Sequence, residues 1–127
     1  MFTIEQGYYI AYKFLERYWY QVDKFRQYAL GEFNLLTAFS CGMEPQDINN
    51  PDPLDQAKYM DWEDAVAPLG NKEKYTSNEL FKALMNFLTF YRTEFEFNIS
   101  EAMEDIRDNQ GELWDEVVDD VVRQYLL

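Results

Sequence analysis

The sequence predicts an all-α protein, a single compact bundle of five to six helices over residues 1–127. Three observations lead to this fold class. Apolar and aromatic residues recur at steps of three and four along most of the chain, which is the period of an amphipathic helix. Helix caps and turn-forming residues separate these stretches. The length suits one domain, and 47% hydrophobic residues are enough for one core despite the charge.

The first helix is expected over residues 4–21. Thr3 and Gln6 have the spacing of a capping box, in which each side chain bonds the other residue's backbone amide. Helically spaced apolar residues follow, including five tyrosines at positions 8, 9, 12, 18 and 20. Because these rings wrap around the helix, some hydroxyls are expected to reach solvent or a partner.

The second helix is expected over residues 24–39, and a loop rich in turn formers over residues 40–51. Asp52 and Pro53 then have the pattern of an N-cap followed by proline at the first helical position. This pattern predicts a third helix that ends near Val66.

Three more helices are expected in the second half of the chain. Thr76 and Glu79 have the spacing of a second capping box, which predicts a helix that extends to about Tyr91. Ser100 is expected to cap a short helix, and Gly111 to separate it from the last one. The last helix has the clearest apolar stripe, formed by Trp114, Val117, Val118, Val121, Val122 and Tyr125.

The first and fourth expected helices share a weak sequence echo at an offset of 73 residues, in which Phe2-Thr3 matches Tyr75-Thr76. An internal duplication would produce this echo. Two unrelated amphipathic helices with the same kind of cap would produce it as well. The sequence leaves both explanations open.

The charge of the chain is strongly negative and unevenly distributed. Twenty-four Asp and Glu residues face eleven Lys and Arg, there is no histidine, and the formal net charge is -13. Residues 61–127 hold sixteen of the acids and six of the bases. Such a charge repels nucleic acid and anionic membranes, and it speeds encounter with basic surfaces. The composition therefore favours binding to a basic protein, with no direct contact to nucleic acid or membrane.

The lack of histidine removes most catalytic and metal-binding options. No Ser–His or Cys–His pair is possible, and no Gly-rich phosphate loop occurs. Residues 105–112 resemble a calcium loop only faintly, because the glycine is one place late and Arg107 takes a ligand position. Cys41, the single cysteine, cannot form an intramolecular disulfide, and the first residues lack a signal-peptide pattern. We expect a cytoplasmic protein that is not an enzyme and has no metal or cofactor.

Acidic runs are the candidate binding surfaces. The run on the last expected helix lies opposite the apolar stripe and includes the like-charge pairs Asp115/Asp119 and Glu116/Asp120. A helix optimised only for stability would alternate such acids with lysine. A docking surface for a basic partner and a solubilising face are both consistent with this run. The full set of predicted partner-binding residues is Asp115, Glu116, Asp119, Asp120, Asp61, Asp64 and Glu112.

Two further acidic groups have a more ordinary interpretation. Asp61 and Asp64 flank Trp62 on the third expected helix, and Trp62 is expected to pack in the core or in a groove. Four acids share one face of the short fifth helix and are expected to be solvated, with docking to Lys and Arg as the alternative. These four are Glu101, Glu104, Asp105 and Asp108.

Part of the chain resembles a known family. Residues 29–36 (ALGEFNLL), Pro51-Asp52-Pro53 and residues 62–66 (WEDAV) are similar to the patterns LG-x-L-x-LL and DP…W-x-D-W-x-x-AV of small helical immunity proteins. These proteins belong to bacterial contact-dependent growth inhibition and related polymorphic toxin systems. Met60-Asp61-Trp62 stands where the family pattern has two tryptophans, so one is missing. The resemblance covers about residues 3–67, and its motifs are packing and capping features.

The resemblance implies a protein that binds a toxin domain delivered by a neighbouring cell. Many such toxins are nucleases with cationic active sites, so the implied partner agrees with the charge of this chain. The expected function is an immunity protein that neutralises a cognate basic toxin domain by blocking its active site. Two alternatives stay open: an acidic nucleic-acid mimic that inhibits a DNA-binding protein, and an adaptor or subunit of a larger assembly, including a homodimer.

Overall fold

The structure, a computed structural model, describes residues 1–21, 42–53, 55–96 and 99–127. This described part is an all-α bundle of five helices, as the sequence predicts. The expected helix over residues 24–39 and Cys41 lie outside it. The helices are α1 (Ile4–Gln21), α4 (Gln56–Val66), α5 (Ser77–Glu94), α6 (Ser100–Asn109) and α7 (Gly111–Val121), with a 3₁₀ turn at Ala67–Leu69 and a π-helical turn at Val122–Leu126.

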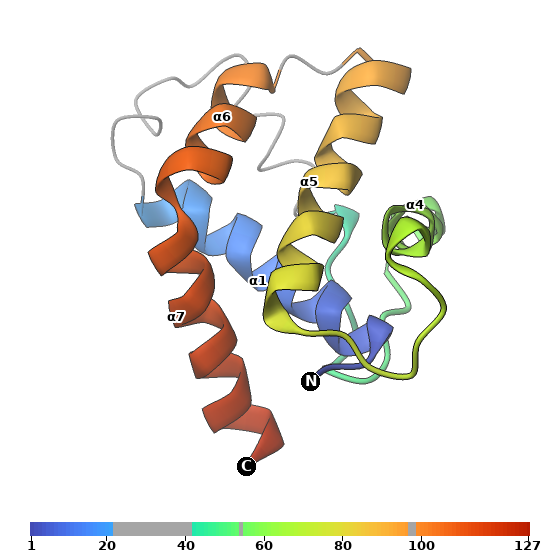
Figure 1. The fold of residues 1–127 in the computed structure, drawn as a ribbon. Helices are drawn as coiled ribbons and strands as arrows, with labels where there is room; N and C mark the ends of the chain where they lie inside the picture. Colours follow the sequence, from blue (N-terminus) through green and yellow to red (C-terminus); the bar gives the residue numbers. More distant parts are fainter. Residues whose placement is uncertain (22–41, 54, 97–98) are drawn as a thin grey trace.

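The helices are arranged around α5 (Figure 1). Helix α4 lies on one side of α5 and α7 on the other, and α6 leads directly into α7. Helix α1 contacts α4, α5 and α7, so the N-terminal helix ties the two sides of the bundle together. In the described part, no helix combines the length and apolar character that crossing a bilayer requires.

Both predicted capping boxes are confirmed. Thr3 Oγ1 accepts a hydrogen bond from the Gln6 amide at 3.1 Å, and the Thr3 amide donates to Gln6 Oε1 at 3.0 Å. Thr76 and Glu79 make the equivalent pair of bonds at 3.1 and 3.0 Å. Each pair satisfies backbone amides that the first helical turn leaves free. The two longest described helices therefore begin where the sequence places them.

The residues that precede the two caps pair with each other. The Phe2 amide donates to the Tyr75 carbonyl at 2.8 Å, and the Tyr75 amide donates to the Phe2 carbonyl at 2.7 Å. Helices α1 and α5 therefore start side by side, and the matched positions of the sequence echo meet in space. This pairing holds whether or not the two helices arose by duplication.

Three predicted helix boundaries are wrong by one to a few residues. Helix α4 begins at Gln56 and is capped by Asp55, whose side chain accepts from the Ala57 amide at 3.1 Å. Asp52 and Pro53 instead accept hydrogen bonds from the Gln56 side chain, so they hold the approach to the helix. Asp52 and Asp55 are both residues that can cap a helix, and the conformation of the chain before α4 determines which of them does so.

At the start of α6, Ile99 takes the N-cap position without a side-chain bond, and Ser100 is already helical. The break between α6 and α7 falls at Gln110, so Gly111 is the first residue of α7 and not a separator. Ser100 was expected to precede α6 and Gly111 to precede α7, but each is the first residue of its helix. Local residue preferences fix such edges only to within a residue or two.

The core is dominated by aromatic side chains. Four of the five tyrosines of α1 are buried, and Tyr20 alone is mostly exposed, at 60%. The expectation that some of these hydroxyls reach solvent is confirmed by Tyr20 alone, because each buried ring donates its hydroxyl to an acceptor within the molecule. Tyr8 donates to the Met43 carbonyl at 2.7 Å and Tyr18 to the Asp105 carboxylate at 2.8 Å. Tyr9 and Tyr12 donate to Tyr125 and Glu16, both at 2.9 Å.

Gly7 permits the close approach of three helices. A Cβ atom at this position would lie 2.5 Å from Leu80 Cδ2 of α5 and 3.3 Å from Trp62 Cζ2 of α4. Contact at 2.5 Å is far inside van der Waals distance, so a side chain on Gly7 would force either Leu80 or the packing of the three helices to shift.

The apolar stripe of the last helix is shorter than predicted. Trp114, Val117, Val118 and Val121 are buried, but Val122 is only half-buried and Tyr125 is 41% exposed. The chain leaves α-helical geometry at Val122 and forms a π-helical turn. Steps of three and four no longer return to the buried face in such a turn, because it has more residues per turn. Tyr125 therefore stands at the surface against Tyr9.

Candidate functional site

Helix α7 presents four carboxylates to solvent. Glu112, Asp115, Glu116 and Asp119 are all exposed, and we refer to these four residues as the acidic ridge. Steps of three and four place them on one helix face. The opposite face packs into the core through Leu113, Trp114, Val117, Val118 and Val121. The predicted opposition of acids and apolar stripe is thus confirmed for these four residues.

No cation within the described part of the chain pairs with the acidic ridge. Residues 100–121 hold nine acids and one base, Arg107. The Arg107 guanidinium is already bound to Asp108 of the same helix, at 2.8 Å. Like charges at these spacings repel each other by a few tenths of a kcal/mol per pair. The ridge therefore directs an uncompensated negative potential into solvent, at a small cost in stability.

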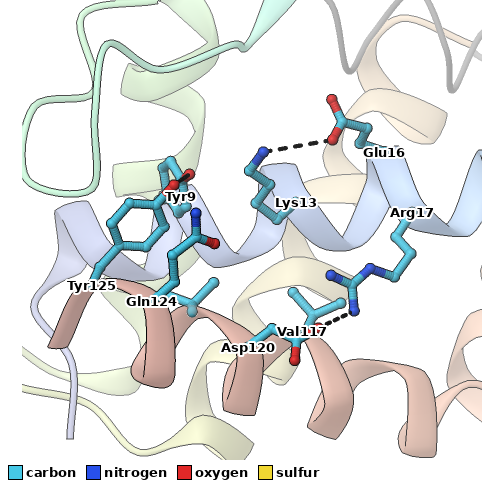
Figure 2. A pocket seen from close by; sticks show the side chains of 9 residues that line it. Tyr9, Lys13, Glu16, Arg17, Val117, Asp120, Gln124 and Tyr125 are labelled. Atoms are coloured by element: carbon cyan, nitrogen blue, oxygen red, sulfur yellow. Dashed lines mark hydrogen bonds and ion pairs between the residues drawn. The ribbon is translucent and has the colours of Figure 1, made fainter. Parts of the chain in front are cut away.

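Asp120, the fifth acid predicted on this helix, is bound within the molecule. Its Oδ2 lies 2.7 Å from Arg17 Nη1 of α1, and its Oδ1 accepts a hydrogen bond from Arg123. The hydrogen bond from Arg17, supported by that from Arg123, lowers the pKa of Asp120 below its ordinary value. Figure 2 shows this ion pair bridging α1 and α7. Asp120 therefore joins two helices and contributes less to the outward field than the ridge does.

The acids of α4 do not join the acidic ridge. Asp61 accepts a hydrogen bond from the Tyr91 hydroxyl of α5, and Asp64 is exposed. Trp62 between them is completely buried and donates to the Ile4 carbonyl at 3.0 Å, which confirms that it packs in the core. Helices α4 and α7 lie on opposite sides of α5 (Figure 1). The seven predicted binding residues thus form two separate surfaces.

One of the four acids of α6 is not solvated. Asp105 is 8% exposed and accepts hydrogen bonds from Tyr18 at 2.8 Å, Asn109 at 2.9 Å and Gln110 at 3.1 Å. Three donors offset the cost of burying its charge. Its role is to fasten the α6–α7 corner to α1. The expectation of a fully solvated face holds only for Glu101, Glu104 and Asp108, which are exposed.

Two hollows flank the acidic ridge. On the α5 side, a shallow hollow of about 390 Å³ is lined by Phe81, Lys82, Arg107, Trp114 and Asp115, among others. On the α1 side, a hollow of about 110 Å³ lies between α1 and α7, with Asp120 in its wall (Figure 2). A ridge of charge between concave surfaces suits a protein interface, where side chains of the partner enter pockets and charges surround them.

A larger hollow of about 280 Å³ lies beside the one on the α1 side and reaches the loop at residues 44–48. The two hollows share Tyr9, Lys13, Glu16 and Tyr125 in their walls, and we call the pair of them the tyrosine groove. The sequence did not identify this groove as a site. The five tyrosines of α1 were the available signal, but the other walls come from segments 30 to 110 residues away.

Within the described residues, no three His, Cys, Asp or Glu side chains gather as metal ligands. Residues 105–109, the start of the faint calcium-loop pattern, form the last turns of α6. The chain matches no protein-family model, no curated protein and no solved structure. The acidic ridge and the hollows on either side of it are the candidate functional surface.

Proposed function

We propose that this chain is an immunity protein that binds a cognate basic toxin domain, a nuclease, and blocks its active site. The observation that carries the proposal is the acidic ridge: four exposed carboxylates on a well-packed helix, with no cation paired to them in the described part of the chain. The resemblance of residues 3–67 to toxin-immunity proteins supplies the class of partner. Charge and resemblance support the same partner by separate routes.

The mechanism follows from the chemistry of the two surfaces. A nuclease holds its substrate phosphates with Lys and Arg, and carboxylates can occupy the same cationic positions. The net charge of -13 accelerates the encounter with such a surface. The packing of Trp114 and Val118 beneath the ridge holds the helix that carries the carboxylates, so only their side chains lose freedom on binding. The protein acts by occlusion, in the cytoplasm of the cell it protects, and performs no chemistry of its own.

The first experiment tests binding and neutralisation together. The tagged chain is mixed with the C-terminal domain encoded by the adjacent upstream gene, and nuclease activity is titrated against the amount of added chain. We expect one tight complex and complete loss of activity at equimolar ratio. A nuclease that keeps its activity, with no complex in light scattering, would reject the proposal.

A charge-matched pair of variants then tests the ridge. The first variant is Glu112→Gln, Asp115→Asn, Glu116→Gln and Asp119→Asn, and the control removes four exposed charges elsewhere, by Glu63→Gln, Glu73→Gln, Glu94→Gln and Glu96→Gln. Both lose the same net charge, so only local position differs. We expect the ridge variant to associate with the toxin domain about tenfold more slowly at low salt, and to lose much of the salt dependence. Equal association rates of the two variants would contradict the role of the ridge.

The other functional classes are outcomes of the same binding experiment. A nucleic-acid mimic would be captured by many unrelated DNA-binding proteins and would compete with plain duplex DNA for each of them. An assembly subunit or homodimer would show a mass above that of one chain in light scattering without any toxin domain. Either result would replace the immunity proposal.

A further inference from the structure

The tyrosine groove has walls from three parts of the chain. Helix α1 contributes Tyr9, Tyr12, Lys13 and Glu16, the loop at residues 44–48 contributes carboxylates, and the turn Val122–Leu126 contributes Tyr125. Tyr9 donates a hydrogen bond to the Tyr125 hydroxyl at 2.9 Å, and the two rings meet edge to face at 5.4 Å. The wall from α1 and the wall from the C-terminal turn are therefore joined by a direct contact between Tyr9 and Tyr125, which Figure 2 shows near each other.

The groove already holds one cation of the protein itself. The Lys13 ammonium lies 5.7 Å from the ring centroids of both Tyr9 and Tyr12, within the range of a cation–π interaction. It is also 3.7 Å from Glu16 Oε1. Aromatic faces and carboxylates together thus form an environment that stabilises a positively charged side chain.

The charges in the groove are not balanced. Lys13 pairs with Glu16, and Arg17 pairs with Asp120. Glu44 and Asp47 in the same walls have no ion pair within the described part of the chain. Asp47 uses one oxygen to accept the Asn49 amide, and its negative charge stays uncompensated. The loop end of the groove therefore has two carboxylates available to a second cation, next to the tyrosine wall that Lys13 already contacts.

The loop end of the groove has room for a single long side chain. Sites for drug-sized molecules have volumes of about 300 to 1,000 Å³. The loop end, at about 280 Å³, is close to the lower end of this range, so a long side chain that projects from a partner surface fits it.

We propose that the tyrosine groove is the pocket for one arginine or lysine side chain of a basic protein partner, with the cation between the tyrosine wall and the Glu44 and Asp47 carboxylates. The proposal takes the basic character of the partner from the proposed function. It adds an anchoring position beside the acidic ridge, in the way that an interface combines a deep central contact with surrounding charge.

The test uses the full chain and a defined probe, hexa-arginine, with hexa-citrulline as the uncharged analogue. Titration at low ionic strength is followed by calorimetry and by NMR shifts of backbone amides. We expect hexa-arginine to shift Tyr12, Lys13, Glu44 and Tyr125, and hexa-citrulline to leave them unchanged. Shifts confined to the acidic ridge, or equal shifts with both peptides, would overturn the groove while leaving the toxin experiment to decide the proposed function.

Two matched comparisons separate the pocket from the general field of the protein. Glu44→Gln with Asp47→Asn is expected to weaken hexa-arginine binding at least about fivefold, and the control Glu73→Gln with Glu94→Gln less than about twofold. The Asn at position 47 keeps the oxygen that accepts the Asn49 amide, so the loop is preserved. Equal weakening by both pairs would overturn the proposal, because it would show attraction to net charge alone.

The second comparison removes the resident cation. Lys13→Gln frees the tyrosine wall, whereas Lys74→Gln removes an exposed lysine elsewhere, and both make the protein more negative by one charge. We expect Lys13→Gln to tighten hexa-arginine binding about threefold more than Lys74→Gln does, because the incoming guanidinium takes over the cation–π contacts. Weaker or equal binding of the Lys13 variant relative to the Lys74 variant would contradict this pocket.

Discussion

Helices α4 and α7 have the same local design and different roles. Each is eleven residues long, buries one tryptophan and carries several acids on its outer positions. The indole N–H of each tryptophan donates a hydrogen bond: Trp62 to the Ile4 carbonyl and Trp114 to Ser77 Oγ, each at 3.0 Å. The acids differ, because Asp61 of α4 is bound by Tyr91, whereas the acidic ridge of α7 meets no cation in the described structure.

This comparison shows that an acidic helix face is not a site by composition alone. Neighbouring helices determine whether an acid can bind a partner. An acid that accepts a hydrogen bond from a hydroxyl or guanidinium of another helix stabilises the fold and is no longer available for binding. Helix α4 faces α5, which supplies Tyr91, and the inner edge of α7 faces α1, which supplies Arg17 to Asp120. The outer edge of α7 faces solvent between two hollows, which leaves its carboxylates available.

The largest expected effect comes from removing the α4 tryptophan. Trp62→Ala is expected to lower the free energy of unfolding by about 3 to 5 kcal/mol, because a completely buried ring is replaced by a cavity. Urea unfolding followed by circular dichroism measures the change. Met60→Ala on the same helix removes a side chain that is 63% exposed and is expected to cost less than about 0.5 kcal/mol. Similar losses for both variants would contradict the central position of Trp62.

A smaller loss of stability is expected when the hydrogen bond from Tyr91 to Asp61 is removed. Tyr91→Phe keeps the ring and removes only the hydroxyl, which leaves the half-buried carboxylate without this hydrogen bond. We expect the free energy of unfolding to fall by about 1 to 2 kcal/mol, as for hydrogen bonds to charged groups. The control, Tyr20→Phe at an exposed position, is expected to change it by less than about 0.5 kcal/mol. An unchanged stability of Tyr91→Phe would return Asp61 to the list of candidate binding residues.

On α7 the sign of the effect is expected to reverse. Asp115→Asn with Glu116→Gln and Asp119→Asn removes like charges at spacings of three and four residues, and no ion pair is lost in the described structure. We expect the free energy of unfolding at low salt to rise by about 0.5 kcal/mol, and the gain to shrink in high salt. A drop in stability would mean that the ridge has internal partners, and the contrast with α4 would then disappear.

The smallest effect is expected at the bridge between α1 and α7, and it depends on pH. The pKa of Asp120 is lowered, first by the hydrogen bond from Arg17, so the pair stabilises the fold above the ordinary carboxyl pKa of about 4. This contribution is lost as the pH falls through the lowered pKa, because the folded protein then binds the proton as well. Arg17→Gln is therefore expected to be less stable than the unsubstituted chain at pH 7 and to converge with it once the pH falls below the lowered pKa of Asp120.

Urea unfolding at a series of pH values measures this convergence. Arg92→Gln, at an exposed position of α5, serves as the control and is expected to show a pH dependence like that of the unsubstituted chain. A difference between Arg17→Gln and the unsubstituted chain that stays constant down to pH 2 would mean that Arg17 acts through packing and not through the Asp120 charge.

Much of the helical structure can be read from the sequence because its causes are local. The capping boxes at Thr3 and Thr76 start α1 and α5, since the bonding groups lie three residues apart in the chain. The period of α7 separates Val117 and Val118 from Asp115 and its neighbours, since one helix turn sets which side chains share a face. The all-α class, these two helix starts and the exposure of the acidic ridge all follow from such short-range relations.

The state of each individual acid was decided only by the tertiary structure. Asp61, Asp105 and Asp120 look like their exposed neighbours in the sequence, but each has a partner on another helix, at 30, 87 and 103 residues along the chain. The tyrosine groove likewise exists only because Tyr125 and the loop at residues 44–48 are packed against α1. Helical periodicity determines the face on which a side chain lies. Which group from a distant segment meets that face is set by how the helices pack, because a hydrogen bond or ion pair needs its atoms within about 3 to 4 Å of each other.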